Sequence, residues 1–253
     1  MRLASRFLLV AAAALILAGC AGGTSAVHRS LSDAAERTLP RKVLLLPVEV
    51  QMHEISTGGV VEKVDAWTQT ASEHADRYIR ELSASSGAFE ILDSPQLTDV
   101  QRAQLEQHIA LYEVVAGSAY FAGQSQVAVW QERAKSFDYT LGPGLKPLAD
   151  GTGIDAAMIV IGSDYISTAG RRAALVMGVV LGALAGVAAA PQGGVSFISV
   201  GVVDMRTGDL LWLGTERSQA TDFRNAPDIR RMLEALFRTY PGLAPAQPAA
   251  RGG

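Results

Sequence analysis

Two short apolar runs constrain the fold of this chain most, because neither leaves a polar face. The first run extends from Lys42 to Val50 and reads KVLLLPVEV, and the second lies between Asp155 and Ile166 and contains AAMIVI. A strand with so little alternation of apolar and polar residues is typical of a sheet that is buried on both faces. Pro47 has no amide hydrogen to donate, so it predicts a bulge or a strand end inside the first run.

Amphipathic helical patterns alternate with these strands. Apolar side chains recur at spacings of three and four from Trp67 to Leu82 and again from Leu97 to Tyr112, and a last pattern starts near Pro227. The alternation predicts an α/β fold in two or three layers, with a mixed sheet of about five strands covered by helices. We place this domain at residues 41–240. Strands are expected at 42–50, 89–92, 155–166, 197–203 and 210–216.

The last two expected strands are separated by Asp204-Met-Arg-Thr-Gly-Asp209, whose Thr-Gly turn predicts a β-hairpin. This segment with Leu211-Trp212, together with KVLLLPV and AAMIVIGSDYIS, resembles a group of bacterial envelope lipoproteins. The group includes the curli-secretion lipoprotein and the N-terminal domain of TolB. The resemblance implies an α/β sandwich but no particular activity, since many members have none assigned. The chain lacks the amphipathic strand pairs of the secretion lipoprotein, so pore formation is not expected.

The N-terminus has the organisation of an export signal. Arg2 and Arg6 precede an uninterrupted apolar stretch from Phe7 to Ala18. Twelve residues of helix measure roughly 18 Å, which is too short to span a hydrocarbon core of about 30 Å. A short positive region followed by an apolar stretch of this length is typical of a secretory signal and not of an anchoring helix.

The sequence Leu17-Ala18-Gly19-Cys20 at the end of that stretch resembles a lipobox, the cleavage site of bacterial lipoprotein precursors. The resemblance implies that residues 1–19 are removed, that the thiol of Cys20 receives a diacylglycerol, and that the new amine is acylated, usually by palmitate. Two or three acyl chains anchor a protein stably, whereas one anchors it only marginally. Ala21 follows the cysteine, which favours sorting to the periplasmic face of the outer membrane over retention at the inner membrane.

Composition narrows the classes of partner. Removal of residues 1–19 moves the formal net charge from −3 to −5, because Arg2 and Arg6 go with them. A mildly acidic chain without a Lys/Arg cluster argues against nucleic acid or an anionic membrane surface as a partner. Cys20 is the only cysteine, so no disulfide framework is expected. Small and polar residues at 20–40 predict a flexible tether, and residues 241–253 are expected to be disordered.

Ala173 to Ala190 is an apolar segment of eighteen residues without a charge. Gly178, Gly182 and Gly186 recur every fourth residue, which on a helix makes a smooth face that another backbone can approach closely. Three interpretations stay open. The segment is a helix or hairpin packed on the domain, a self-association or membrane-dipping element of an oligomer, or a transmembrane helix. The last would separate the predicted strands into two compartments.

Catalytic signatures are scarce. The sequence has no GxSxG, Walker or GxGxxG pattern, and no HExxH, CxxC or paired-His spacing, so neither a cofactor nor a metal site is predicted. Glu49, His53 and Glu54 form one polar cluster at the end of the first strand, where α/β folds often place ligands. Two carboxylates and an imidazole are able to perform acid–base chemistry, and a solvated loop explains them equally well.

These observations favour a non-enzymatic, lipid-anchored envelope protein. We expect a periplasm-facing module that is attached to the membrane through acylated Cys20 and binds other envelope proteins or its own copies. One alternative is an envelope hydrolase that uses Glu49, His53 and Glu54. Another is an oligomeric outer-membrane assembly that inserts residues 173–190, with Gly178, Gly182 and Gly186 as contacts.

Overall fold

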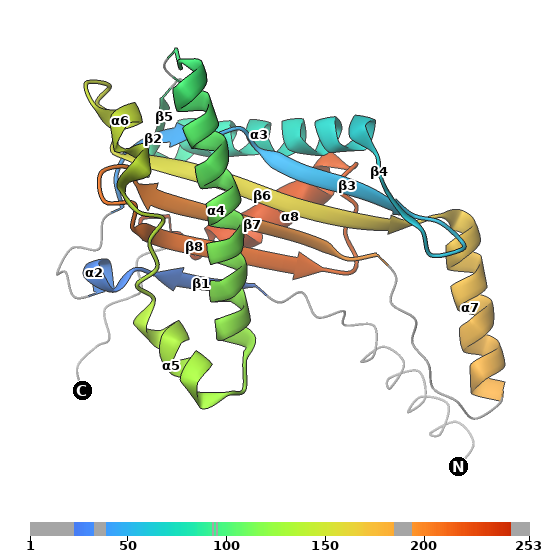
Figure 1. The fold of residues 1–253 in the computed structure, drawn as a ribbon. Helices are drawn as coiled ribbons and strands as arrows, with labels where there is room; N and C mark the ends of the chain where they lie inside the picture. The colour runs from blue at the N-terminus through green and yellow to red at the C-terminus, as the bar shows by residue number, and fades with distance from the viewer. Residues whose placement is uncertain (1–22, 33–38, 93, 95, 185–193, 244–253) are drawn as a thin grey trace.

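The computed structural model describes residues 23–32, 39–92, 94, 96–184 and 194–243, and it shows an α/β fold with one mixed sheet (Figure 1). The predicted fold class is confirmed, although the described residues contain eight strands and not about five. The strands are β1 (Thr24–Val27), β2 (Lys42–Leu45), β3 (Glu49–Ile55), β4 (Val61–Lys63), β5 (Glu90–Leu92), β6 (Ala156–Ser167), β7 (Ser196–Asp204) and β8 (Leu210–Ser218). The helices are α2 (Arg29–Ser32), α3 (Asp65–Ser86), α4 (Asp99–Gln124), α5 (Ala128–Ser136), the 3-10 turn η1 (Pro143–Leu145), α6 (Lys146–Ala149), α7 (Ala169–Leu184) and α8 (Ala226–Phe237).

Strand β6 organises the sheet. It pairs antiparallel with β7 on one edge and parallel with both β2 and β3 on the other, and the order across the sheet is β1-β8-β7-β6-β2-β5. The run expected as one strand is two strands in succession along β6, because Pro47 interrupts the ladder between them. The Leu46 amide still donates to the Met158 carbonyl at 3.0 Å, so the break predicted at the proline is confined to the linking residues.

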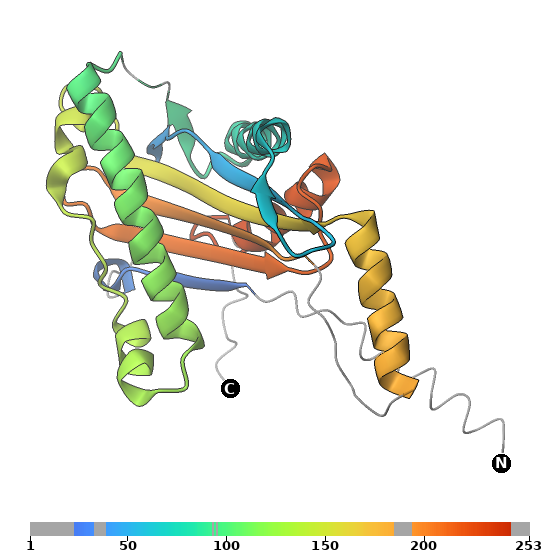
Figure 2. The same ribbon diagram turned by 45° about the vertical axis from the view of Figure 1, so that its right-hand side comes forward.

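Each face of the sheet carries its own hydrophobic core, as the two-sided apolar runs predict. Helices α3 and α8 cover one face, and α4 with the η1–α6 segment covers the other, which gives three layers (Figure 2). Along β6 the side chains of Met158 and Val160 join the first core, while Ala157 and Ile159 join the second. The alternation of side chains along a strand therefore supplies both cores from the same residues.

Helix α4 approaches the sheet closely where Tyr112 crosses β7. The Tyr112 hydroxyl and the Ser199 hydroxyl are hydrogen-bonded at 2.8 Å in the buried interior. Gly201 makes room for the ring, since a Cβ atom at this position would lie 2.3 Å from a ring carbon of Tyr112. The small residue on β7 therefore sets how near α4 packs.

The predicted hairpin between β7 and β8 is present, and its turn explains the Asp-x-x-Thr-Gly pattern. One carboxylate oxygen of Asp204 accepts the amides of Arg206 and Thr207 at 2.7 and 3.0 Å, and this closes the turn. Gly208 follows with φ of 79°, a conformation that favours glycine. Its position is also crowded, because a Cβ atom there would lie 1.9 Å from the carbonyl oxygen of Gly142.

The prediction of a flexible tether over residues 20–40 is wrong for part of that segment. Residues 24–27 form β1, which pairs antiparallel with β8, and His28 is buried with its backbone amide bonded to the Leu211 carbonyl. Strand β8 needs a partner for its outer edge, and a short stretch of small residues can supply one whatever its own propensity. Ala26 then packs on the α4 side of the sheet and Val27 on the α3–α8 side.

We predict that Gly208→Ala lowers the free energy of unfolding by more than about 1 kcal/mol, because it combines a positive φ with a backbone clash. Gly117→Ala in α4 is the matched control, since a Cβ atom there meets nothing within 4 Å. The control is expected to raise stability by about 0.5–1 kcal/mol, as alanine is the better helix former. Urea denaturation followed by circular dichroism measures both. Equal effects of the two substitutions would contradict the role of the turn.

Candidate functional site

The predicted lipid-attachment residue, Cys20, lies outside the described residues, as does the lipobox. The described chain begins at Gly23 and enters β1 one residue later. Two residues therefore separate Gly23 from Cys20 in the sequence, and lipidation of Cys20 stays a prediction.

The cluster of Glu49, His53 and Glu54 is not assembled, so the structure contradicts this candidate site. All three residues lie on β3. Alternation places Glu54 on the opposite face of the sheet from the other two, where its charge acts on Arg224. Glu49 and His53 share a face but are four residues apart, which is about 13 Å along a strand. The first strand was expected to end at Val50, but β3 continues through to Ile55, so these residues lie within a strand and not at its end.

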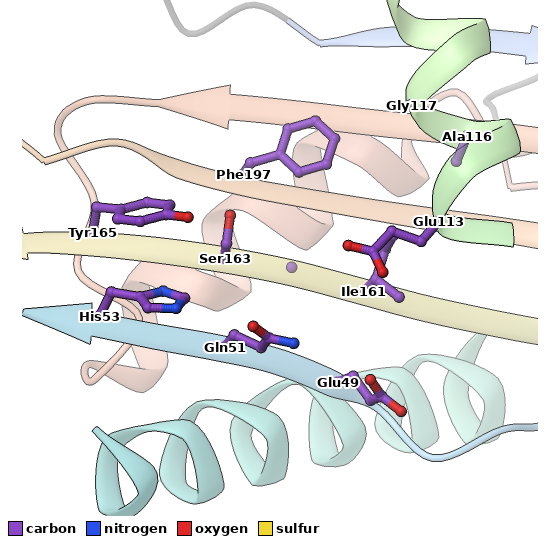
Figure 3. Close-up of a pocket in the computed structure, with 11 residues that line it drawn as sticks. Glu49, Gln51, His53, Glu113, Ala116, Gly117, Ile161, Ser163, Tyr165 and Phe197 are labelled. Carbon is purple, nitrogen blue, oxygen red and sulfur yellow. The ribbon is translucent and has the colours of Figure 1, made fainter. Parts of the chain in front are cut away.

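A shallow hollow does form on the face of the sheet that carries Glu49 and His53, between β3, β6, β7 and α4 (Figure 3). Its volume is about 340 Å³. The His53 ring stacks on the Tyr165 ring, with centroids 4.7 Å apart and planes 10° from parallel. The other lining residues are Gln51, Glu113, Ala116, Gly117, Ile161, Gly162, Ser163 and Phe197.

The chemistry of this hollow is limited. His53 Nδ1 is buried and has no hydrogen-bond partner within the described part of the chain. Nucleophilic catalysis requires a nucleophile and a base in hydrogen-bond contact, and His53 shows no such contact through this nitrogen. Glu113, Tyr165 and Phe197 come from distant parts of the sequence, so no local pattern could have predicted that they meet Gln51 and His53.

Helix α4 exposes an apolar stripe on the side that faces away from the sheet. Leu111, Val114 and Phe121 are 41, 66 and 60 % exposed, and they lie within about 80° of one another around the helix axis. The Phe121 ring meets the Trp130 ring of α5 edge-on at 5.9 Å. We call this the α4–α5 surface, formed by Val100, Leu111, Val114, Phe121, Val127, Val129 and Trp130, all of which are exposed.

The sequence identified the inner face of α4 correctly but not this outer one. Leu105, Ile109 and Tyr112 were expected inside and are buried, whereas Val100 was also expected inside and is 71 % exposed. Gln107, Ala110 and Ser118 share the outer stripe with the apolar residues by helical periodicity, so no formal charge interrupts it. The outer stripe could have been recognised in the sequence, because the outward side of a surface helix normally carries polar and charged side chains and this one has no charge.

The apolar segment at 173–190 is helical over its described part and projects from the end of the sheet. Helix α7 leaves β6 and leads away from the rest of the domain in both views (Figures 1 and 2). Val176 and Met177 are 64 and 59 % exposed, so these two side chains do not pack on the described part of the domain, which was one of the three interpretations. Gly178 and Gly182 lie within α7, whereas Gly186 lies outside the described residues. Within the described ranges, no helix has both the length and the hydrophobicity needed to cross a membrane.

A buried carboxylate holds the loop after β8 against the end of β6. Asp164 is 1 % exposed, and it accepts the Ser196 hydroxyl at 2.9 Å and the Phe223 amide at 2.8 Å. Burial raises the pKa of Asp164 above its ordinary value of 3.8, although both hydrogen bonds oppose that rise. Next to it, the Arg224 guanidinium is bonded to Asp222 and lowers the pKa of that carboxyl. The same guanidinium lies 4.5 Å from the centre of the Trp67 ring.

Metal chemistry finds no support in this part of the molecule. In the portion of the chain that the structure describes, no three His, Cys, Asp or Glu side chains gather closely enough to hold a metal ion. His53 stacks on Tyr165, and His108 bonds through Nδ1 to the Gln104 carbonyl of its own helix at 2.8 Å.

Comparison with known proteins adds little about function. No family model matches the chain, and no curated protein matches it. Among solved structures, the PelC dodecamer from Paraburkholderia phytofirmans is similar with a TM-score of 0.34 and 7 % identity, covering 89 % of this chain and 99 % of that one. A substituted form of the same dodecamer gives a TM-score of 0.33 and 9 % identity with the same coverage. These TM-scores are too low to support an argument about fold or function.

The Asp164 site predicts a pH dependence of stability. Burial raises the pKa of Asp164 in the folded protein. The stability that Asp164 contributes to the folded state is therefore complete below the ordinary carboxyl pKa and is lost as the pH rises through the folded-state pKa. We expect the free energy of unfolding of the wild type, relative to Asp164→Asn, to fall as the pH rises above about 4. Urea denaturation at a series of pH values measures this difference.

Asp222→Asn is the matched control for this measurement, because the Asp222 pKa is lowered by Arg224. Its contribution is present above the ordinary carboxyl pKa and is lost as the pH falls, so the wild type gains stability relative to Asp222→Asn as the pH rises. A difference between wild type and Asp164→Asn that stays constant with pH would show that Asp164 is not perturbed.

Proposed function

We propose that this chain is a lipid-anchored, non-enzymatic assembly module of the bacterial cell envelope. Acylated Cys20 holds it at the periplasmic face of the outer membrane, and the α4–α5 surface binds another envelope protein or a second copy of the chain. The proposal joins the lipobox, which indicates where the protein works, with a surface of the folded domain that is suited to protein contact.

The α4–α5 surface is the observation that carries the proposal. Large apolar side chains scattered singly on a surface need no explanation, but a contiguous group on one helix face is typical of an interaction site. Burying one such side chain on association contributes on the order of 1.5–3 kcal/mol. Phe121 and Trp130 already contact each other, and paired aromatic rings of this kind often dominate binding energy at interfaces.

The absence of charge on the stripe supports a protein partner. Charged residues are depleted at the centres of protein interfaces, because a charge buried there without a partner is costly. On α4 the exposed Arg102, Glu106 and Glu113 lie to one side of the stripe by helical periodicity, which places a polar rim next to an apolar centre. A second copy could align the same stripe against itself without opposing like charges.

The hydrolase alternative loses its basis, because β3 separates Glu49, His53 and Glu54. The hollow in Figure 3 gathers polar residues but shows no nucleophile activated by a base among its described residues. We therefore do not assign a reaction to this face.

Val114→Glu with Phe121→Glu is predicted to weaken association at the α4–α5 surface by about tenfold or more, since two buried charges would have to lose their water. A photo-crosslinking amino acid at Ser118, within the stripe, is expected to give adducts in intact cells. The two glutamates should remove those adducts while the protein stays folded by circular dichroism.

The same crosslinker at Ala84 is the matched control, because that exposed position lies on α3, on the other face of the sheet. It is expected to give no adduct that depends on Val114 and Phe121. A protein that gives no adduct from Ser118, and whose mass in detergent is that of a monomer, would contradict the proposed interface.

Cys20→Ala is predicted to abolish acylation and to remove the protein from the outer membrane, leaving it soluble or retained at the inner membrane. Mass spectrometry of the mature N-terminus and density-gradient fractionation of membranes measure the two effects. Detection of unmodified Cys20 in the wild type would contradict a lipid anchor at this residue. Persistence of the variant in the outer membrane would instead point to the glycine-spaced segment as a second anchor.

A further inference from the structure

We infer that α7 is a second membrane attachment, which dips into the same leaflet that holds the acyl chains of Cys20. This inference rests on the lipid anchor of the proposed function, and it names the surface of the domain that faces the bilayer. The occupant of the exposed α7 surface is therefore lipid and not a protein.

The direction of β1 points its start, four residues after Cys20 in the sequence, toward the α7 end of the sheet. Strand β1 is antiparallel to β8, which is antiparallel to β7, which is antiparallel to β6, so β1 and β6 run in opposite directions. The start of β1 at Thr24 consequently points the same way as the end of β6, from which α7 continues. Four residues of chain, at most about 14 Å, join Thr24 to Cys20.

Helix α7 also extends toward the side of the sheet on which β1 lies. The sheet ends with β1 at one edge, and in Figures 1 and 2 α7 descends from the end of β6 past the level of β7 and β8 toward that edge. The start of β1 therefore points toward α7, and the strand register places Thr24 level with Ile161, near the middle of β6. A lipid surface that receives the acyl chains of Cys20 lies within reach of α7.

The composition of α7 suits an acyl-chain environment. No residue from Ala173 onward in the helix is charged, and its exposed residues include Ala173, Ala174, Val176 and Met177. The twelve helical residues from 173 to 184 measure about 18 Å, which is comparable to the roughly 15 Å thickness of half a hydrocarbon core. The helix is thus long enough to enter one leaflet and too short to cross both.

The base of α7 combines rigidity with positive charge. The Thr168 hydroxyl accepts the Arg171 amide at 3.2 Å, and the Thr168 carbonyl accepts the Arg172 amide at 2.9 Å, which fixes the first turn of the helix. Arg172 is exposed at the boundary between the domain and the uncharged part of the helix. An arginine at such a boundary lies at the level of lipid phosphates when the apolar part is inserted.

Lipid is favoured over a second copy because it is already present. An acylated Cys20 keeps the bilayer next to α7 in every molecule, so insertion is intramolecular and does not depend on protein concentration. Each apolar side chain that enters the leaflet then adds to the attachment made by the acyl chains.

The test places a fluorophore on α7 of the full-length lipidated protein. Acylation consumes the thiol of Cys20, the only cysteine, so Met177→Cys creates one site for an environment-sensitive dye. Val114→Cys on the α4–α5 surface is the matched control, with a similar exposed fraction of 66 % against 59 %. Both proteins are reconstituted into phosphatidylethanolamine–phosphatidylglycerol vesicles at fewer than one protein per vesicle and exposed to doxyl-labelled lipids or to aqueous iodide.

We expect the doxyl lipids to quench the dye at position 177 several-fold more than at position 114, and iodide to show the reverse. Iodide quenching that is equal at the two positions would overturn the inference. Protection of position 177 from both quenchers would also overturn it, because that result means burial in protein.

A second variant tests whether quenching at position 177 reflects insertion of α7 into the leaflet. Val176→Glu in the Met177→Cys background is expected to bring doxyl quenching down to the level of position 114, with circular dichroism unchanged, and undiminished quenching would count against insertion. Dye uptake by the wild-type protein would show that Cys20 is not acylated. In that case the anchor of the proposed function fails, and the inference fails with it. Loss of the α4–α5 contact, by comparison, leaves the quenching result unaffected.

Discussion

The structure depends on the burial of both faces of β6. Its backbone pairs with neighbouring strands along both edges, and its side chains alternate between the two hydrophobic cores. Such a strand cannot exist alone, because its apolar side chains on both faces need a cover of helices. Helices α3 and α8 supply it on one face, and α4 with the η1–α6 segment supplies it on the other. Asp164, near the end of β6, then accepts two hydrogen bonds that hold the loop after β8, and α7 continues from the last residues of the strand.

Strand β6 therefore contributes to the stability of both cores and also determines the orientation of α7. The direction of β6 sets where α7 projects, and the opposite direction of β1 points the start of that strand, Thr24, toward the same end. In the arrangement that we propose, this end meets the bilayer through acyl chains and α7, while the α4–α5 surface is left for a protein partner. The two apolar surfaces of the domain would then serve different environments, one lipid and one protein, instead of competing for the same contact.

Sequence patterns predicted the elements well where they reflect local burial. The inner faces of α3, α4 and α8 were correctly expected apart from Val100 on α4, since the three- and four-residue spacing records which side of a helix is buried. The break at Pro47 and the hairpin at Asp204 to Asp209 follow equally from local chemistry. Strand β1 was missed because its pairing comes from β8, almost two hundred residues away, and not from its own composition. The prediction of a cluster of Glu49, His53 and Glu54 was wrong for a related reason. The strand was expected to end at Val50, but pairing with β6 extends it to Ile55.

The sequence by itself determined the α/β class, the burial of the sheet on both faces and the hairpin turn, and it predicted a lipidated Cys20. Each of these depends on residues that are close together in the sequence. Only the tertiary structure decided which residues gather on a surface. It separated Glu49 from His53 along a strand, brought Tyr165 and Phe197 to the same hollow, and left Val114 and Met177 exposed on different sides of the domain. The physical reason is that periodicity reports whether a side chain is buried within its own element, whereas strand pairing and helix packing determine which distant elements meet and which faces remain uncovered.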